Sequence, residues 1–239
     1  MQLRSDYLSQ PQIQHLLKGH EDKLQMLKLP NPKKRVQAIV EIKKIIQQKI
    51  NALGNVNSTK DLVEPFSILI SHLLRDDNQE VFVESLNLLK FIVGSLAPHL
   101  SALDLHLMMG SFIGVIISAS EKSRTRMASD KVIIFFAKHN NIGSVIVAKE
   151  ICKNIDRLNK TAFVASGLAD NDEDKKEVLA RLYSILQMLV QQFSIVLCYQ
   201  PEFYRKMLES IAETLTSCKD EPIIKTACTQ MIVTLYSID

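Results

Sequence analysis

The chain contains no tryptophan, and glycine and proline number only seven each among its 239 residues. A β-sandwich or barrel of this length needs many tight turns, which glycine and proline supply, so their scarcity argues against an all-β fold. No segment of useful length alternates apolar and polar residues, so a βαβ fold is not expected either. Aliphatic residues are plentiful, and the composition therefore favours helices.

Motifs of metal sites and enzymes are missing as well. The four cysteines, Cys152, Cys198, Cys218 and Cys228, share no CxxC spacing and have no histidine at ligand spacing, so we expect buried thiols. The acidic cluster at 170–174 lacks the glycine and the terminal glutamate of a calcium-binding EF-hand loop. The sequence holds no glycine-rich phosphate loop, no HExxH motif and no Ser-His-Asp arrangement. We predict no metal, no cofactor and no enzymatic activity.

A large excess of one charge sign is also lacking, since the formal net charge is +3. The lysines do not form one continuous stripe with interleaved aromatic residues, so nucleic acid is not an expected partner. The apolar run at 105–117 is shorter than the roughly 20 residues that a membrane span requires, and Asp104 and His106 lie at its start. No basic-then-apolar leader opens the chain. We therefore predict a cytoplasmic protein with no membrane partner.

The sequence does contain helical hairpins, of which residues 102–139 are the clearest. An apolar run is followed by a short polar connector at 118–123 and by a second segment with apolar residues at three- and four-residue steps. In that second segment we expect these side chains to face the core: Met127, Ala128, Val132, Phe135 and Phe136. A hairpin alone cannot cover its own apolar sides, so it predicts neighbours of the same kind.

The same pattern recurs along the chain. Helices are expected at residues 11–29 (with a break at Gly19 and His20), 33–53, 58–74, 79–95, 102–117, 124–138, 142–158, 174–198, 201–218 and 223–238. We expect Asn31 to cap the second helix and Pro32 to lie in its first turn, and we expect a longer loop after residue 158. These are about ten helices in five hairpins of about 40 residues, the period of HEAT and armadillo repeats. The prediction is an all-α solenoid with a single domain at 1–239, which we expect to be part of a larger protein.

Three turns carry a resemblance to a known family: residues 29–38, 76–86 and 121–128. With these turns and this period, the chain resembles a TOG domain from about residue 23 to residue 237. TOG domains are the tubulin-binding HEAT arrays of microtubule polymerases, CLASPs and some ciliary-tip proteins. The resemblance implies about five HEAT-like hairpins in one compact paddle, tubulin or microtubules as the partner, and a location at the cytoskeleton, the centrosome or the cilium.

The resemblance also implies a binding site, because the turns within the hairpins of TOG domains line one edge that grips tubulin. Carried over by position, the site residues are Asn31, Pro32, Lys33, Lys34, Arg35, Asn78, Lys122, Arg124, Arg126, Lys160, Lys219 and Lys225. The cations among them would steer an acidic partner, whereas Asp76, Asp77 and the acids at 170–174 would repel it. The family usually has a tryptophan in the first turn. Pro32 occupies that place here, which implies weak or absent binding of free tubulin.

Alternatives remain open for several of these residues. The cations at 33–35 oppose the dipole of the helix that they begin, so they are either solvated surface or partner contacts. Arg126 suits either tubulin or an acid of a neighbouring repeat. The second candidate function is a HEAT- or armadillo-type adaptor that binds a partner protein or peptide without tubulin contact.

Overall fold

The computed structural model describes residues 10–52, 57–119, 123–164, 172–198, 200–218 and 220–237. Within these ranges the chain forms eleven α-helices and one short 3₁₀ helix, and it forms no strand. The elements are α2 (Pro11–Leu16), α3 (Glu21–Leu27), α4 (Pro32–Ala52), α5 (Asn57–Leu73), α6 (Gln79–Leu96), η1 (Ala97–His99), α7 (Ala102–Ala119), α8 (Ser123–Lys138), α9 (Gly143–Val164), α10 (Asp172–Cys198), α11 (Pro201–Ser217) and α12 (Pro222–Tyr236). The predicted all-α solenoid of helical hairpins is confirmed.

The helix starts follow from local chemistry. Asn31 caps α4 as predicted, since its Oδ1 accepts a hydrogen bond from the backbone N–H of Lys33 at 3.0 Å. Pro32 is the first residue of that helix, where its missing N–H costs nothing. Asn78 caps α6 in the same way. Side-chain acceptors at these places satisfy the free N–H groups of the first helical turn.

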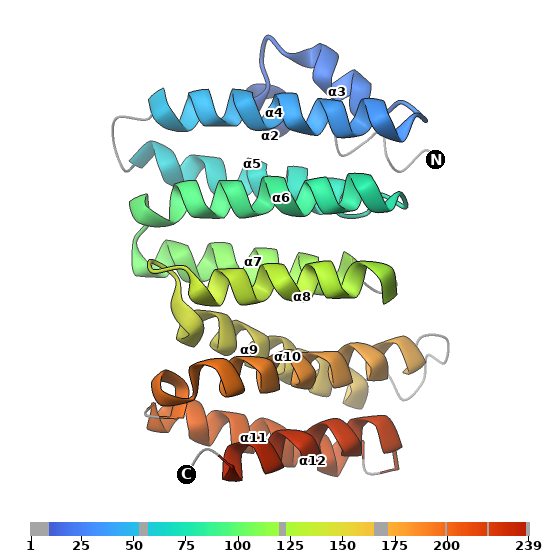
Figure 1. Cartoon of the computed structure of the whole chain (residues 1–239), viewed down its shortest axis with the longest axis vertical. Coiled ribbons are helices and arrows are strands. Elements are labelled where there is room, and N and C mark those ends of the chain that lie inside the picture. The colour runs from blue at the N-terminus through green and yellow to red at the C-terminus, as the bar shows by residue number, and fades with distance from the viewer. Residues whose placement is uncertain are drawn as a thin grey trace. The chain divides into compact units, whose positions relative to one another are not determined.

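The chain divides into two compact units, unit 1 (Met1–Phe135) and unit 2 (Phe136–Asp239). In unit 1, α5 packs against α2 and α7 in one layer, and α4 packs against α6 in a second layer that faces the viewer in Figure 1. Helix α3 packs on α4. In unit 2, α9 packs against α11, and α10 packs against α12. The single domain at 1–239 stays a prediction.

Helix α6 shows how the core of unit 1 is built. Its buried side chains include Phe82, Leu86 and Leu89. Together with η1, this helix spans residues 79–99, and by length and composition it is the one helix among the described residues that is apolar enough to cross a membrane. However, 56% of that window is buried inside the structure, as in a core helix of a folded domain.

The expected inward face of α8 is correct for Val132 and Phe136, which are buried, and wrong for two other side chains. Met127 and Phe135, both predicted to be inward, are 66% and 39% exposed, whereas Ser129 and Ile133 are fully buried. Two adjacent apolar stripes run along this helix, and periodicity gives the spacing of a stripe without choosing between neighbouring ones. The helices packed against α8 make that choice.

One predicted helix break is confirmed, and one predicted helix end is wrong. The first helix is divided into α2 and α3, with Gly19 between them at a φ of 84°, so the predicted break is confirmed. Helix α9 continues to Val164, beyond its predicted end near residue 158, so the expected loop position of Lys160 is wrong. In this added part of the helix, Asn159 is buried and donates a hydrogen bond to Thr214 of α11.

Candidate functional site

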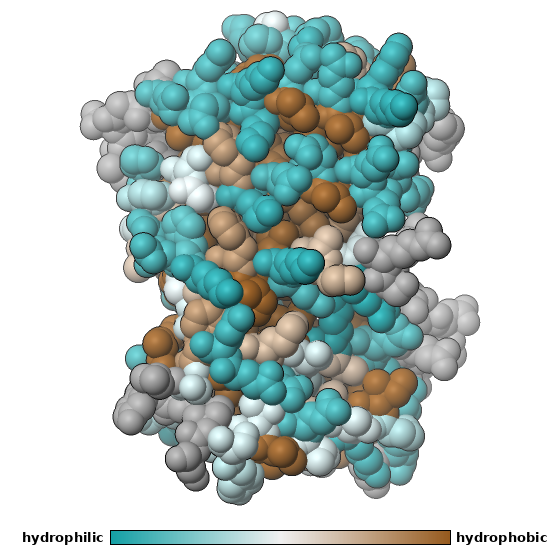
Figure 2. Space-filling view, viewed as in Figure 1, coloured by the Kyte–Doolittle hydropathy of each residue, from teal (hydrophilic) through white to brown (hydrophobic). Residues whose placement is uncertain are grey.

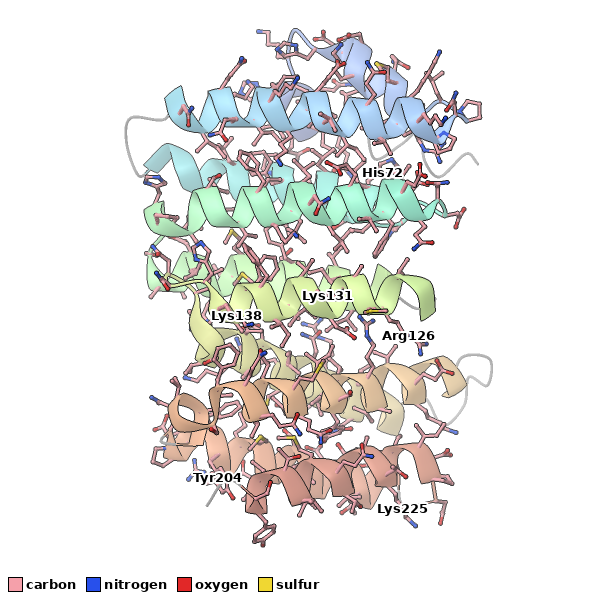
Figure 3. The ribbon with its side chains drawn as sticks, viewed as in Figure 1. His72, Arg126, Lys131, Lys138, Tyr204 and Lys225 are labelled. Atoms are coloured by element: carbon pink, nitrogen blue, oxygen red, sulfur yellow. The ribbon has the colours of Figure 1, made fainter. Side chains whose placement is uncertain are left out.

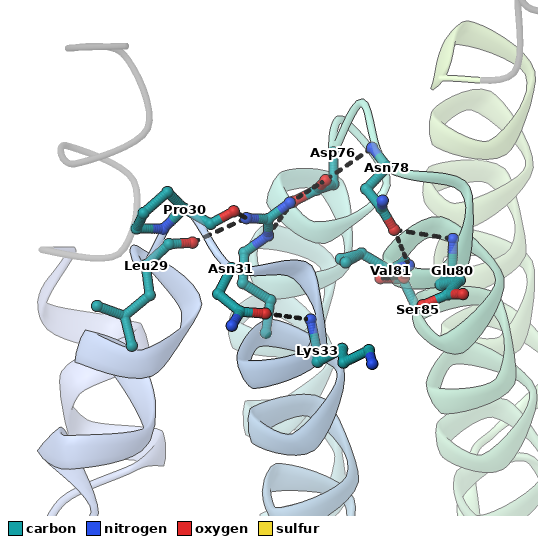
Figure 4. Close-up of polar contacts among 10 residues, drawn as sticks. Leu29, Pro30, Asn31, Lys33, Asp76, Asn78, Glu80, Val81 and Ser85 are labelled. Atoms are coloured by element: carbon teal, nitrogen blue, oxygen red, sulfur yellow. Dashed lines mark hydrogen bonds and ion pairs between the residues drawn. The ribbon is translucent and has the colours of Figure 1, made fainter.

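Two turns of unit 1 come together at one end of its hairpins. We call them the turn edge, and they consist of residues 29–35, which lead into α4, and residues 75–80, which join α5 to α6. Both turns begin a helix of the same layer, because α4 and α6 pack against each other. Figure 4 shows the polar contacts that connect them.

Arg35 holds the two turns together. One guanidinium nitrogen, Nη1, donates hydrogen bonds to the carbonyl oxygens of Leu29 and Pro30, both at 2.8 Å. The other, Nη2, donates to Oδ1 of Asp76 at 3.0 Å. The Nε atom lies 2.9 Å from Oδ2 of the same carboxylate as an ion pair, without the alignment of a hydrogen bond. The two side chains are only 9% and 10% exposed, so this is a buried ion pair.

The carboxylate of Asp76 also orders its own turn. Its Oδ1 accepts a hydrogen bond from the backbone N–H of Asn78 at 2.9 Å. Asn78 in turn accepts from the N–H groups of Glu80 and Val81 at 3.0 and 3.2 Å. A chain of bonds therefore runs from the turn before α4 to the first turn of α6, so both turns share one fixed arrangement.

The solvent-facing charge of the turn edge is mixed. Lys33 and Lys34 are exposed in the first turn of α4, and Arg75 is exposed after α5. Asp77 and Glu80 are exposed as well. Arg35 and Asp76 neutralise each other. The exposed charges are then three cations and two acids, so the edge has a small positive excess on the α4 side.

The structure places some of the predicted site residues on this edge and others elsewhere. Asn31, Lys33 and Lys34 are exposed on the edge, and Pro32 and Asn78 are half-buried there. Arg35 has a structural role in place of the expected contact with a partner, because its guanidinium is used inside the protein. Arg126 is half-buried in the first two turns of α8 (Figure 3). Lys122 lies outside the described residues, and so does the side chain of Arg124.

In unit 2, the predicted residues belong to its own hairpin ends. Lys160 is exposed near the end of α9, and Lys225 is exposed in the first turn of α12 (Figure 3). Lys219 lies outside the described residues. An ion pair at 2.6 Å joins Lys176 near the start of α10 to Glu221 before α12. It connects two hairpins of unit 2, as Arg35 and Asp76 do in unit 1.

A buried polar cluster crosses unit 2 between α9, α10 and α11. The hydroxyl of Tyr183 donates to the carbonyl oxygen of Ser210 at 3.0 Å and lies 2.7 Å from Oγ1 of Thr214. Asn159 donates to the same Thr214 oxygen at 2.9 Å. Ser210 donates to Asp156 at 2.7 Å, and Lys206 pairs with that carboxylate at 3.1 Å. The polar groups of the cluster are hydrogen-bond partners of one another, so we interpret the cluster as a structural element.

Two thiols lie in the core of unit 2. Burial raises the pKa of Cys152 to about 12, and the charge of Asp156 adds to the effect. Burial likewise raises the pKa of Cys228 to about 11, against a hydrogen bond with Tyr183 that lowers it. The pKa of the Tyr183 hydroxyl is also raised, chiefly by burial. All three groups stay protonated and unreactive at neutral pH. In the described part of the chain, no three His, Cys, Asp or Glu side chains gather as metal ligands.

The sequence analysis missed the partnership of Arg35 with Asp76 and treated the aspartate as a repelling charge. A signal was present in the spacing, because the two residues are 41 positions apart. That separation matches the hairpin period of about 40, which places equivalent turn positions of successive repeats next to each other. The Tyr183 cluster gave no comparable signal, because its members come from three helices at unrelated spacings.

No protein-family profile and no curated protein sequence matches the chain. Among solved structures, it is similar to the TOG domain of human Cep104, with 17% sequence identity and a TM-score of 0.49. The likeness covers 100% of this chain and 95% of the other. It does not describe what this chain binds.

Proposed function

We propose that the chain is a non-catalytic protein-binding module that engages tubulin or microtubules through the turn edge. The observation that supports this most is the buried pair of Arg35 and Asp76, which joins two successive turns into one surface. Lys33 and Lys34 project from that surface into solvent. The sequence resemblance to TOG domains suggests the partner.

A rigid edge suits recognition of a large folded partner. The turn carbonyls and N–H groups are already bonded in the free protein, so binding needs little further ordering of the backbone. Exposed lysines at the start of α4 would steer an acidic surface and set the register of docking. The affinity is expected to be modest, since the described part of the edge carries no large aromatic anchor.

Two binding measurements test this proposal. The full chain is sedimented with taxol-stabilised microtubules, and it is also run on gel filtration with free tubulin. The variant Lys33→Glu with Lys34→Glu is expected to weaken microtubule binding by about tenfold, because charge reversal at an interface rim slows association and adds repulsion. Unchanged binding of this variant would contradict the role of the turn edge.

The matched control is Lys18→Glu with Arg205→Glu, which changes the net charge by the same amount at exposed sites outside the edge. It is expected to bind like the unmodified chain. Equal weakening by both variants would mean that only total charge matters. Absence of binding by the unmodified chain in both assays would leave the adaptor without tubulin contact as the better description.

A further inference from the structure

Unit 1 carries a second charged surface, on the helices of its viewer-facing layer. The carboxyl-terminal parts of α4, α6 and α8 up to Phe135 hold lysines and no acid. We call this surface the lysine face, and its cations are Lys43, Lys44, Lys49, Lys90 and Lys131. The acids of the same three helices all precede these lysines on their own helix: Glu41, Glu80, Glu84 and Asp130.

Two of these acids are already engaged within the protein. Glu41, the acid nearest in sequence to the lysines of α4, pairs with Lys23 at 2.6 Å. Glu84 accepts a hydrogen bond from Asn87. No lysine of the lysine face is ion-paired with a carboxylate in the described part of the chain. Their charges are therefore available to another molecule.

Aromatic rings hold two of these lysines in place. The ammonium group of Lys43 lies 5.2 Å from the ring centroid of Phe91, so α4 contacts α6. In the same way, Lys90 lies 5.8 Å from the ring centroid of Phe135, which connects α6 to α8. Such cation–π contacts restrict the long side chains and orient their charges. The α4–α6 and α6–α8 contacts thus contain the same kind of pair.

Apolar surface is interspersed with these charges. Phe135 is 39% exposed and Val40 is 38% exposed. Hydrophilic and hydrophobic residues alternate over the helices of this layer in Figure 2, and Figure 3 marks Lys131 midway along α8. A partner that fits this surface needs several negative charges with apolar side chains between them.

We infer that the lysine face binds an acidic, extended peptide segment of a partner protein, laid across α4, α6 and α8. Packed helices lie about 8–10 Å apart, and an extended peptide advances about 3.3 Å per residue. About three residues of such a peptide therefore span the distance from one helix to the next. Acidic residues at every third position would each lie over the lysines of one helix. This surface is distinct from the turn edge, and the inference does not depend on tubulin binding.

Single-stranded nucleic acid is another polyanion that exposed lysines attract, and the observations favour it less. Binding of bases requires free aromatic faces on which they stack. Here the lysines of the protein itself lie over the rings of Phe91 and Phe135. The surface also has no arginine, whose planar group pairs with phosphate through two hydrogen bonds.

The test is fluorescence anisotropy with the full chain and a labelled peptide of Glu-Leu-Ser repeats, about 15 residues long. We expect it to bind at least about tenfold more tightly than the same peptide with Gln in place of Glu. The variant Lys44→Glu, Lys90→Glu, Lys131→Glu is expected to lose at least about tenfold in affinity for the Glu peptide. If circular dichroism shows that this variant is unfolded, the corresponding Lys→Gln variant is measured, with the same direction expected.

The matched control is Lys18→Glu, Lys28→Glu, Arg205→Glu, at exposed sites outside the lysine face and the turn edge. It has the same net charge as the triple variant and should bind the peptide within about twofold of the unmodified chain. Equal loss in both triple variants, no difference between the Glu and Gln peptides, or tighter binding of a labelled oligothymidylate would each overturn the inference. If the unmodified chain binds microtubules but does not bind the Glu peptide, the lysine face alone is refuted. If the unmodified chain binds the Glu peptide but does not bind microtubules, the turn edge alone is refuted.

Discussion

Arg35 is the residue whose role changes most between sequence and structure. A cation in the first turn of a helix is unfavourable toward the helix dipole, and partner binding was one explanation for its position. The structure supplies another, since its guanidinium bonds two carbonyls of the preceding turn and the carboxylate of Asp76. Arginine suits this place better than lysine, because its planar group presents several donors in fixed directions.

Removing one partner of this pair should destabilise unit 1. We expect Arg35→Ala and Asp76→Ala each to lower the free energy of unfolding by about 3–5 kcal/mol, because each leaves a buried charge uncompensated. Urea unfolding followed by circular dichroism measures the loss. Lys33→Ala, two residues away and exposed, should change the free energy by less than about 0.5 kcal/mol.

The double variant Arg35→Met, Asp76→Leu tests whether the two side chains act as a pair. It should be clearly less destabilised than the sum of the single variants, since both charges leave the interior together. A double variant whose loss equals that sum would show that the two side chains act independently.

Because unit 2 contains buried thiols, we expect its free energy of unfolding to fall at alkaline pH. An unperturbed thiol titrates near pH ~8.5, whereas Cys152 and Cys228 keep their protons to about 12 and 11 in the folded chain. Above the unperturbed pKa, the unfolded chain thus binds fewer protons than the folded one. The contribution to stability is complete below pH ~8.5 and falls as the pH rises toward the folded pKa values, by at most about 1.4 kcal/mol per pH unit for each thiol.

Urea unfolding with reductant at several pH values between about 7.5 and 10 measures this slope. The variant Cys152→Ala, Cys228→Ala is the comparison, and its stability should fall less steeply with pH. Identical slopes for the two proteins would mean that other groups, such as Tyr183, dominate the alkaline response.

At the scale of the element, α8 shows where helical periodicity stops being informative. The segment has apolar residues on more than one stripe, and the expected stripe included Met127 and Phe135, which the structure exposes. Helix α6 shows the opposite case, because most of its apolar residues lie on one broad buried face that includes Phe82, Leu86 and Leu89. Helix α6 is also the more apolar of the two over its whole length, so more of its apolar side chains are buried.

Alanine substitutions along these helices test the assignment. We expect Phe82→Ala and Leu86→Ala in α6, and Ile133→Ala in α8, each to cost about 2–5 kcal/mol of unfolding free energy, because all three side chains are buried. Met127→Ala should cost less than about 1 kcal/mol, since that side chain is mostly exposed. Thermal or urea melts give the values, and a larger loss for Met127 than for Ile133 would restore the face expected from the sequence.

At the scale of the whole molecule, the net charge of +3 conceals two different surfaces in unit 1. The turn edge combines cations and acids around a buried ion pair, whereas the lysine face has cations alone. The microtubule and peptide experiments are therefore informative as a pair. Distant, independent sites should give effects that add, so a chain that carries both sets of substitutions should lose both activities to the extent of each set alone.

The sequence by itself determined the helical class, most helix boundaries and the position of the turns. Those features depend on local chemistry: Asn31 and Asn78 as caps, prolines at helix starts, and apolar residues at helical spacing. The predicted contacts with tubulin remain predictions, and several of them lie outside the described residues.

Only the tertiary structure decided which stripe of α8 is buried, that Arg35 bonds Asp76, and that the Tyr183 cluster joins three helices. Each of these depends on a residue far away in the chain, so no local pattern encodes it. The same holds for the lysine face, whose cations lie on three helices and become one surface only when those helices stack. Helix formation is set within a few residues, but burial and pairing of charge are set by neighbours that folding brings together.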